Sequence, residues 1–290
     1  MRDRPPYGWP VTTHSTQPTP AAGAGGLLRH WRRQRHRSQL DLSLDTGVSA
    51  RHLSFVETGR SQPSRGLLLA LAEQLEVPLR ERNALMLAAG YAPAYTHSDL
   101  DGEQTQAARE ALQHLLTGHE PYPAVVLDRW GDVVLANGTI GVLLEGVDPA
   151  LLSPPINVYR LSLHPDGLAP RIGNREQWTA HLGHRLARLA RLTGDARLTE
   201  LLTEIRRYPG VAAALDSQHE PSSRELLLTL QLSHPAGELH LHSTITSFGS
   251  PHDVTLAELA VESFFPADAA TCQVLHRLAG NVPHPTQEDT

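Results

Sequence analysis

The stretch that decides the fold runs from Ser38 to Arg60 and reads SQLDLSLDTGVSARHLSFVETGR. Ser38 and Ser49 are favoured helix N-caps, so they predict two short helices, the first ending at Gly47 and the second at Gly59. Two short helices joined by a glycine turn can lay the start of the second helix in the major groove of DNA. The stretch therefore predicts a helix-turn-helix, although small helical bundles use similar turns.

The flanking sequence extends this motif to a five-helix bundle. Leu28 and Trp31 form the apolar stripe of a helix that precedes it. Ser64 predicts the N-cap of a fourth helix, and Leu85 and Met86 belong to the apolar pattern of a fifth.

The charges are unevenly distributed along the chain. Residues 1–95 hold 12 Arg against 7 acidic residues, a net +5, and the remainder holds 13 Arg against 24, a net −11, which together give the total of −6. A basic segment is expected in a protein that neutralises DNA phosphates. A run of arginines is more often a solvated helix face, so charge alone does not establish DNA binding.

The composition excludes several classes of protein. No run approaches the ~18 apolar residues of a membrane helix, and the N-terminus has no signal-peptide core. The single cysteine, Cys272, excludes a disulfide framework within the chain and a multi-cysteine metal site. These features predict a cytoplasmic protein.

The segmental pattern predicts two domains and three further segments. They are a disordered leader (1–25), a helix-turn-helix domain (26–92), a linker with a connecting helix (93–119), a second domain (120–280) and a tail (281–290). In the second domain, alternating apolar residues predict two β-hairpins, and helical spacing predicts further helices. The hairpins are 124–128 with 132–136 and 224–233 with 238–248, and the helices are 178–192, 195–206, 256–264 and 269–278. Mixed strands and helices predict an α+β domain.

Residues 26 to about 90 resemble the XRE, or Cro/CI-type, DNA-binding domain. The resemblance is carried by Ser38-Gln39, by Gly47-Val48 in the turn and by VETGR at 56–60. It implies that Gln39 caps the second helix and touches the DNA backbone, and that the third helix faces the base edges. It implies a structural role for Glu57. The predicted DNA-contacting residues are Gln39, Ala50, Arg51, His52, Ser54, Phe55 and Arg60.

Three residues depart from the XRE pattern. Thr46 stands where the family usually has an apolar residue, and Leu40 and Leu44 lie one turn apart on a face that such domains often leave polar. This face either packs on a partner or on the C-terminal domain, or it extends the core of the bundle.

Residues from about 120 to 280 resemble the MmyB-like ligand-binding domain, a PAS-like module that follows an XRE head in many actinobacterial regulators. Three motifs match in order: YPAVVLDRWGDVVLAN (122–137), INVYRLSLHPDGLAPRIGN (156–174) and GELHLHSTITSFGSPHDVTLAELAVESFFPAD (237–268). The resemblance implies an unidentified small-molecule ligand, and no cofactor is predicted. The candidate ligand contacts are Trp130, Asn137, Asn157, Arg160, His164 and Phe248.

Enzymatic alternatives have little support in the sequence. His181 with His184 and His240 with His242 share element faces, but no HExxH motif or cysteine cluster accompanies them, so no metal site is predicted. Ser243 and Ser250 lack a GxSxG elbow, so no catalytic residue is predicted.

The sequence thus predicts an all-α, five-helix DNA-binding domain followed by an α+β, PAS-like domain. The expected protein is a sequence-specific transcription regulator, a homodimer controlled by a small apolar or amphipathic ligand, and not an enzyme. In the alternative, the C-terminal domain is a protein-interaction or dimerisation module whose core is filled by side chains. An enzyme with a DNA-targeting head is a third class, which a metal at the paired histidines would favour.

Overall fold

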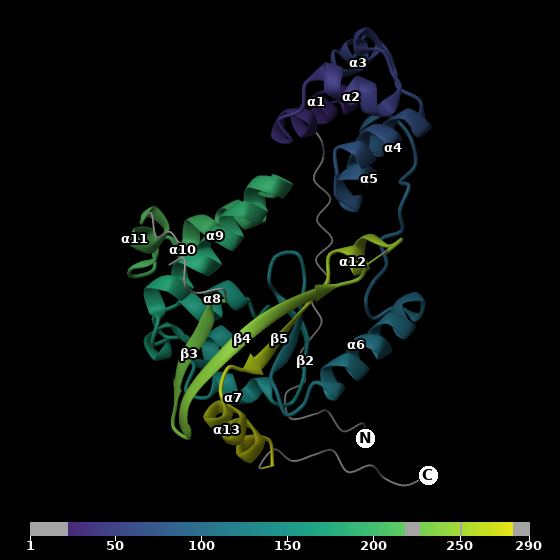
Figure 1. The fold of residues 1–290 in the computed structure, drawn as a ribbon. Coiled ribbons are helices and arrows are strands. Elements are labelled where there is room, and N and C mark those ends of the chain that lie inside the picture. Colours follow the sequence, from purple (N-terminus) through teal and green to yellow (C-terminus); the bar gives the residue numbers. More distant parts are fainter. Residues whose placement is uncertain (1–22, 218–226, 250, 281–290) are drawn as a thin grey trace. The chain divides into compact units, whose positions relative to one another are not determined.

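The structure, a computed structural model, describes residues 23–217, 227–249 and 251–280, and they form two compact units (Figure 1). The head unit contains the described residues up to 99 together with 251–257. The body unit contains the described residues of 100–249 and 258–280. Residues 1–22 of the predicted leader, the tail and the start of the predicted strand at 224 lie outside the described residues. Ala24 and Gly25, which the prediction also places in the disordered leader, belong to the first helix.

The head unit consists of short helices, and α2, α3 and α4 begin at serine caps. The helices are α1 (Ala24–Gln34), α2 (Gln39–Thr46), α3 (Ala50–Glu57), α4 (Arg65–Gln74), α5 (Leu79–Ala88) and the later α12 (Val254–Ala257). The hydroxyls of Ser38, Ser49 and Ser64 accept hydrogen bonds from backbone N–H groups three residues on, at 3.0 to 3.2 Å. Gly47 ends α2 with φ +67°, which glycine adopts without strain. The predicted five-helix bundle is confirmed.

A segment from far along the chain completes the head unit. Val254 N–H donates to the carbonyl of Thr96 at 2.8 Å, and the hydroxyl of Thr255 donates to the carbonyl of Ser98 at 2.6 Å. A carboxylate oxygen of Asp253 accepts from Ser98 N–H at 3.0 Å. The compact units therefore divide the chain differently from the predicted boundaries, because 93–99 and 251–257 belong with the head.

The body unit is built on an antiparallel sheet whose order, among the described residues, is β2-β1-β5-β4-β3. The strands are β1 (Ala124–Leu127), β2 (Val133–Ala136), β3 (Thr229–His234), β4 (Gly237–Ser247) and β5 (Ala260–Pro266). Strand β5 lies in the centre, paired to β1 and to β4 (Figure 1). Both hairpins are confirmed, and the domain is α+β and PAS-like.

Helices surround this sheet. The α-helices are α6 (Gln106–Gly118), α7 (Ile140–Leu144), α8 (Val158–Leu163), α9 (Arg175–Thr193), α10 (Ala196–Ile205), α11 (Val211–Asp216) and α13 (Ala269–Ala279). Short 3-10 turns occupy Glu103–Thr105, Pro149–Leu152 and Ala169–Arg171. Helix α13 packs against β4, and α10 and α11 pack against α9.

The prediction of a helix at 256–264 is wrong. Helix α12 ends at Ala257, and most of the predicted helix is the central strand β5. Three successive residues of this strand, Val261, Glu262 and Ser263, are buried. A strand covered on both faces does not alternate between apolar and polar residues, so its sequence resembles that of a buried helix.

Candidate DNA-binding surface and ligand cavity

Helix α3 presents one buried face and one accessible face. Leu53, Val56 and Glu57 are buried against the bundle. Among the predicted base-reading residues of this helix, Arg51 is exposed and Ala50, Ser54 and Phe55 are half-buried. The guanidinium of Arg51 lies over the ring of Phe55, 5.5 Å from its centroid. The structure therefore leaves all four residues at least partly accessible and brings the side chains of Arg51 and Phe55 together.

A buried ion pair holds this helix in place. The guanidinium of Arg32 in α1 donates two hydrogen bonds to the Glu57 carboxylate, at 2.6 and 2.8 Å. The side-chain amide of Gln39 donates a third, at 2.8 Å. Burial alone would raise the pKa of Glu57, but the bonds from Arg32 and Gln39 and the charge of Arg32 hold it below its ordinary value. Glu57 thereby joins α1, α2 and α3.

The remaining predicted DNA contacts lie around α3. Ser38, and not Gln39, caps α2; Gln39 is the first residue of that helix, and its amide is bonded to Glu57. His52 is half-buried in the first turn of α3. Arg60 follows α3 with its backbone N–H bonded to the carbonyl of Phe55 at 2.8 Å, and the residue is exposed.

The departures from the XRE pattern do not extend the core. Leu40 is 60% exposed and Leu44 is 74% exposed, so the alternative in which they enlarge the core is wrong. The hydroxyl of Thr46 donates to the carbonyl of Leu42 at 2.6 Å, which satisfies this polar group within the helix.

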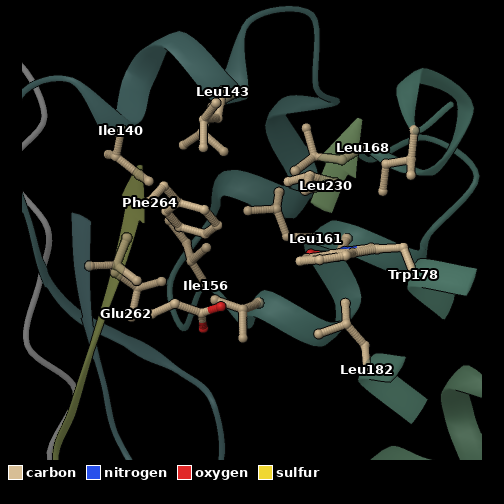
Figure 2. Close-up of a pocket in the computed structure, with 16 residues that line it drawn as sticks. Ile140, Leu143, Ile156, Leu161, Leu168, Trp178, Leu182, Leu230, Glu262 and Phe264 are labelled. Carbon is tan, nitrogen blue, oxygen red and sulfur yellow. The ribbon is translucent and has the colours of Figure 1, made fainter. Parts of the chain in front are cut away.

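The body unit contains an apolar cavity of about 60 Å³ between the sheet and α7, α8 and α9 (Figure 2). Its walls are mainly Leu, Ile and Val side chains, together with the rings of Trp178 and Phe264. The lining residues are Val125, Val133, Ile140, Leu143, Leu144, Ile156, Val158, Leu161, Ser162, Leu168, Ile172, Trp178, Leu182, Leu230, Glu262 and Phe264. Small-molecule sites are typically concave and apolar with few polar groups, and this cavity has that character.

None of the six predicted ligand contacts lines this cavity. Trp130 instead belongs to a polar cluster, where its indole N–H donates to Asp195 at 3.1 Å and the guanidinium of Arg197 lies 4.5 Å from its ring. The amide of Asn157 donates to Asp132 at 2.7 Å, and its oxygen accepts from the N–H groups of Tyr159 and Arg160 at the start of α8.

The other four also have contacts elsewhere or lie at the surface. Asn137 accepts from Ala124 N–H at 3.0 Å, which fixes the start of β1. Arg160 forms two bonds of 2.7 Å with Glu204, and the ring of His164 packs edge-on against Tyr208. Phe248 is 36% exposed. The contacts of five of the six predicted residues are therefore structural ones within the fold: Trp130, Asn137, Asn157, Arg160 and His164.

The side chains of the two histidine pairs contact other groups of the fold. Within the described residues, no group of three or more His, Cys, Asp or Glu side chains is arranged to hold an ion. His240 contacts Asp268 at 2.8 Å, His242 contacts the hydroxyl of Thr229 at 3.3 Å, and His184 contacts the carbonyl of Leu215 at 3.3 Å.

The sequence matches two families at the positions of these two units. Residues 28–82 match the helix-turn-helix family, and residues 108–278 match the MmyB-like transcription regulator ligand binding domain. The chain belongs to the MmyB-like transcription regulators. It is therefore a DNA-binding transcription regulator with a ligand-binding domain, and the resemblances to XRE and MmyB-like proteins are confirmed.

The other comparisons add little to this assignment. No match is found among curated proteins. A solved structure of an RNA-binding light-oxygen-voltage receptor is 12% identical, with a TM-score of 0.26, over 88% of this chain and 63% of that one. The regulator thus spans less than two thirds of that receptor, and so low a TM-score supports no conclusion. Over its described residues, the regulator has no helix with the length and apolarity needed to cross a bilayer.

Asp128, in the turn of the first hairpin, has a strongly perturbed acidity. One of its carboxylate oxygens accepts from the N–H groups of Trp130 and Asp132, both at 2.9 Å. Burial and the nearby charge of Asp132 raise the pKa of Asp128 to about 7. The folded body therefore holds a proton on Asp128 at acid pH.

We expect Glu57→Gln to destabilise the head by about 3 to 5 kcal/mol, because it leaves Arg32 buried without a counter-charge. Urea unfolding measures the loss. The matched control is Asp45→Asn, which breaks the exposed pair between Asp45 and Arg37 and should change stability by less than about 1 kcal/mol. Equal effects of the two substitutions would contradict the proposed importance of Glu57. Because the pKa of Glu57 is lowered, its stabilisation is present above pH 4.5 and is lost as the pH falls further.

We expect Asp128→Asn to become increasingly stabilising as the pH rises from 4 to 8. Asn keeps an oxygen that accepts both backbone bonds, but it cannot ionise. The folded pKa of Asp128 is raised, so its contribution to stability is complete below pH 3.8 and is lost as the pH rises through about 7. Relative to wild type, the free energy of unfolding of Asp128→Asn should increase by up to about 4 kcal/mol as the pH rises, at 1.36 kcal/mol per pKa unit.

Urea unfolding at a series of pH values measures the difference between Asp128→Asn and wild type. Thr203→Ala is the control, because it changes an exposed residue of the same unit that does not ionise, and its difference from wild type should stay constant with pH. A constant difference for Asp128→Asn would show that this carboxyl is not protonated in the folded body.

Proposed function

We propose that this regulator acts in the cytoplasm, binds a roughly palindromic operator as a homodimer and reads base edges with the accessible face of α3. A small molecule in the body cavity would alter its affinity for DNA. The accessible cluster of Ala50, Arg51, Ser54 and Phe55 carries the DNA-reading part of this proposal, because it lies on the second helix of a helix-turn-helix.

The chemistry of these side chains suits base recognition. A guanidinium such as that of Arg51 can donate two hydrogen bonds to O6 and N7 of guanine. Ala50 and the ring of Phe55 can contact thymine methyl groups. Arg60, exposed beyond the end of α3, is placed to neutralise a phosphate, and Gln39 at the start of α2 is a further candidate for the DNA backbone.

Dimerisation is proposed from the size of the reading surface. One short helix offers few base contacts, and two heads about one DNA turn apart would match a symmetric operator. The exposed Leu40 and Leu44 are apolar groups that a partner could cover.

Ligand control is proposed from the cavity. An effector shifts DNA affinity only if it binds one conformational state more tightly than another. The alternative of a pure interaction module predicts a core filled by side chains, whereas the body unit contains a cavity lined by apolar groups.

We expect Arg51→Ala to weaken binding to the preferred operator by about 1 to 3 kcal/mol and to relax specificity at one base pair. Arg60→Ala should weaken binding to all DNA sequences to a similar extent and reduce the slope of log K against log salt by about 1. Fluorescence anisotropy with an operator selected from random DNA, over a salt series, measures both effects.

Arg188→Ala is the control, because it removes the same charge from an exposed position on α9 in the body unit. Two outcomes would refute the assignment of α3 as the helix that reads bases. One is unchanged specificity in Arg51→Ala, and the other is wild-type binding that depends on salt concentration but not on DNA sequence.

A further inference from the structure

Among the described residues, one charged group lines the cavity of the body unit. Apart from Ser162 and the indole N–H of Trp178, the lining residues other than Glu262 have apolar side chains. Glu262 lies on the central strand β5, two residues before Phe264, so both side chains project from the same face of the sheet. Figure 2 shows the Glu262 carboxylate among the apolar side chains of the cavity wall. A buried carboxylate in such a wall restricts the chemical class of ligand that the cavity can bind.

The carboxylate of Glu262 is held in place from one side. Arg185 on α9 donates to one of its oxygens, at 3.2 Å. Arg185 is not itself a lining residue, so its guanidinium stabilises the charge without offering a donor to the cavity. A carboxylate has about four acceptor sites on its two oxygens, so this single bond leaves acceptor capacity on Glu262.

The charge and the acceptor-only character of Glu262 define the complementary ligand. A hydroxyl or ammonium group can donate to an ionised carboxylate, and such charge-assisted bonds are stronger than neutral ones. A second carboxylate brought to the same place would add a like charge in an apolar surrounding. A group that only accepts hydrogen bonds, such as an ether, would find no partner on Glu262.

The size of the cavity limits the rest of the ligand. Each buried water needs roughly 10 to 15 Å³ of such volume, so about 60 Å³ corresponds to some four to six waters. A molecule of about six heavy atoms, most of them carbon, fits that space.

We propose that the cavity binds a small apolar molecule with one terminal hydrogen-bond donor, an alcohol or a primary amine, which donates to Glu262. Carboxylic acids of the same size are excluded. This inference rests on the proposed function of the cavity as the effector site.

The test uses four probes that each contain five carbon atoms, with the full-length protein: 1-pentanol, pentylamine, pentanoate and butyl methyl ether. The ether is an isomer of pentanol that lacks a donor. Titration calorimetry at pH 7 is expected to show pentanol and pentylamine binding about tenfold or more tightly than pentanoate and the ether, the effect of one bond to a charged group. Equal affinities, tighter binding of pentanoate or no binding of any probe would overturn the proposal.

Three variants locate the effect. Glu262→Gln keeps the shape of the side chain but introduces a hydrogen-bond donor. The affinity ratio of pentanol or pentylamine to pentanoate should therefore fall about tenfold or more in this variant. Glu200→Gln makes the same change at an exposed position of α10 outside the cavity wall, so it should keep the wild-type order. Val133→Phe adds a ring at the wall and should abolish binding of all four probes. An unchanged order in Glu262→Gln, or unchanged binding in Val133→Phe, would also overturn the proposal.

A separate measurement distinguishes this inference from the proposed function. If the donors bind in the expected order but leave operator affinity unchanged, the ligand class stands and ligand control of DNA binding fails. If Arg51→Ala fails to alter specificity, the reading helix is wrong while the calorimetry still decides the ligand class.

Discussion

The double pairing of strand β5 is the constraint on which the body unit depends. Its residues bond along one edge to β1, more than 130 positions earlier in the chain, and along the other edge to β4. The two hairpins thereby become one sheet. Because side chains alternate along a strand, the same pairing directs Glu262 and Phe264 to the cavity face. The charged group of the cavity wall, as far as the structure describes it, therefore comes from this one strand.

In the head unit, a polar contact has the corresponding role. Arg32 and Glu57 are buried, and their two hydrogen bonds join the first helix to the end of α3. The pair leaves the opposite face of α3 accessible, so the residues that hold the helix are distinct from those proposed to read DNA. Substitutions on the accessible face can alter specificity without removing the support of the fold.

The sequence predicted the head more completely than the body, because the signals of the head are local. Serine caps and Gly47 act over three or four residues, and each occupies its predicted place. In the body, β5 was predicted as a helix because burial on both faces removes the alternation that marks a strand. The predicted ligand contacts were polar residues of distinctive motifs, such as Trp130 and Asn157, and their polar groups are bonded within the fold. The cavity wall is mostly Leu, Ile and Val, which sequence alone cannot separate from ordinary core. Only Glu262, an acid within the apolar run AVESFFP, offered a signal.

The completion of the head by residues 251–257 has a consequence for biosynthesis. The ribosome releases the helices up to Ala88 long before it makes Val254 and Thr255, whose backbone and hydroxyl bonds cover the end of that bundle. At 5 to 20 residues per second, the interval is on the order of 10 to 30 s. For that time the nascent bundle is exposed at the edge that α12 later covers. Assembly of the DNA-binding unit thus finishes only after most of the sheet of the body unit has been translated, so a chain that terminates before residue 251 does not contain a complete head.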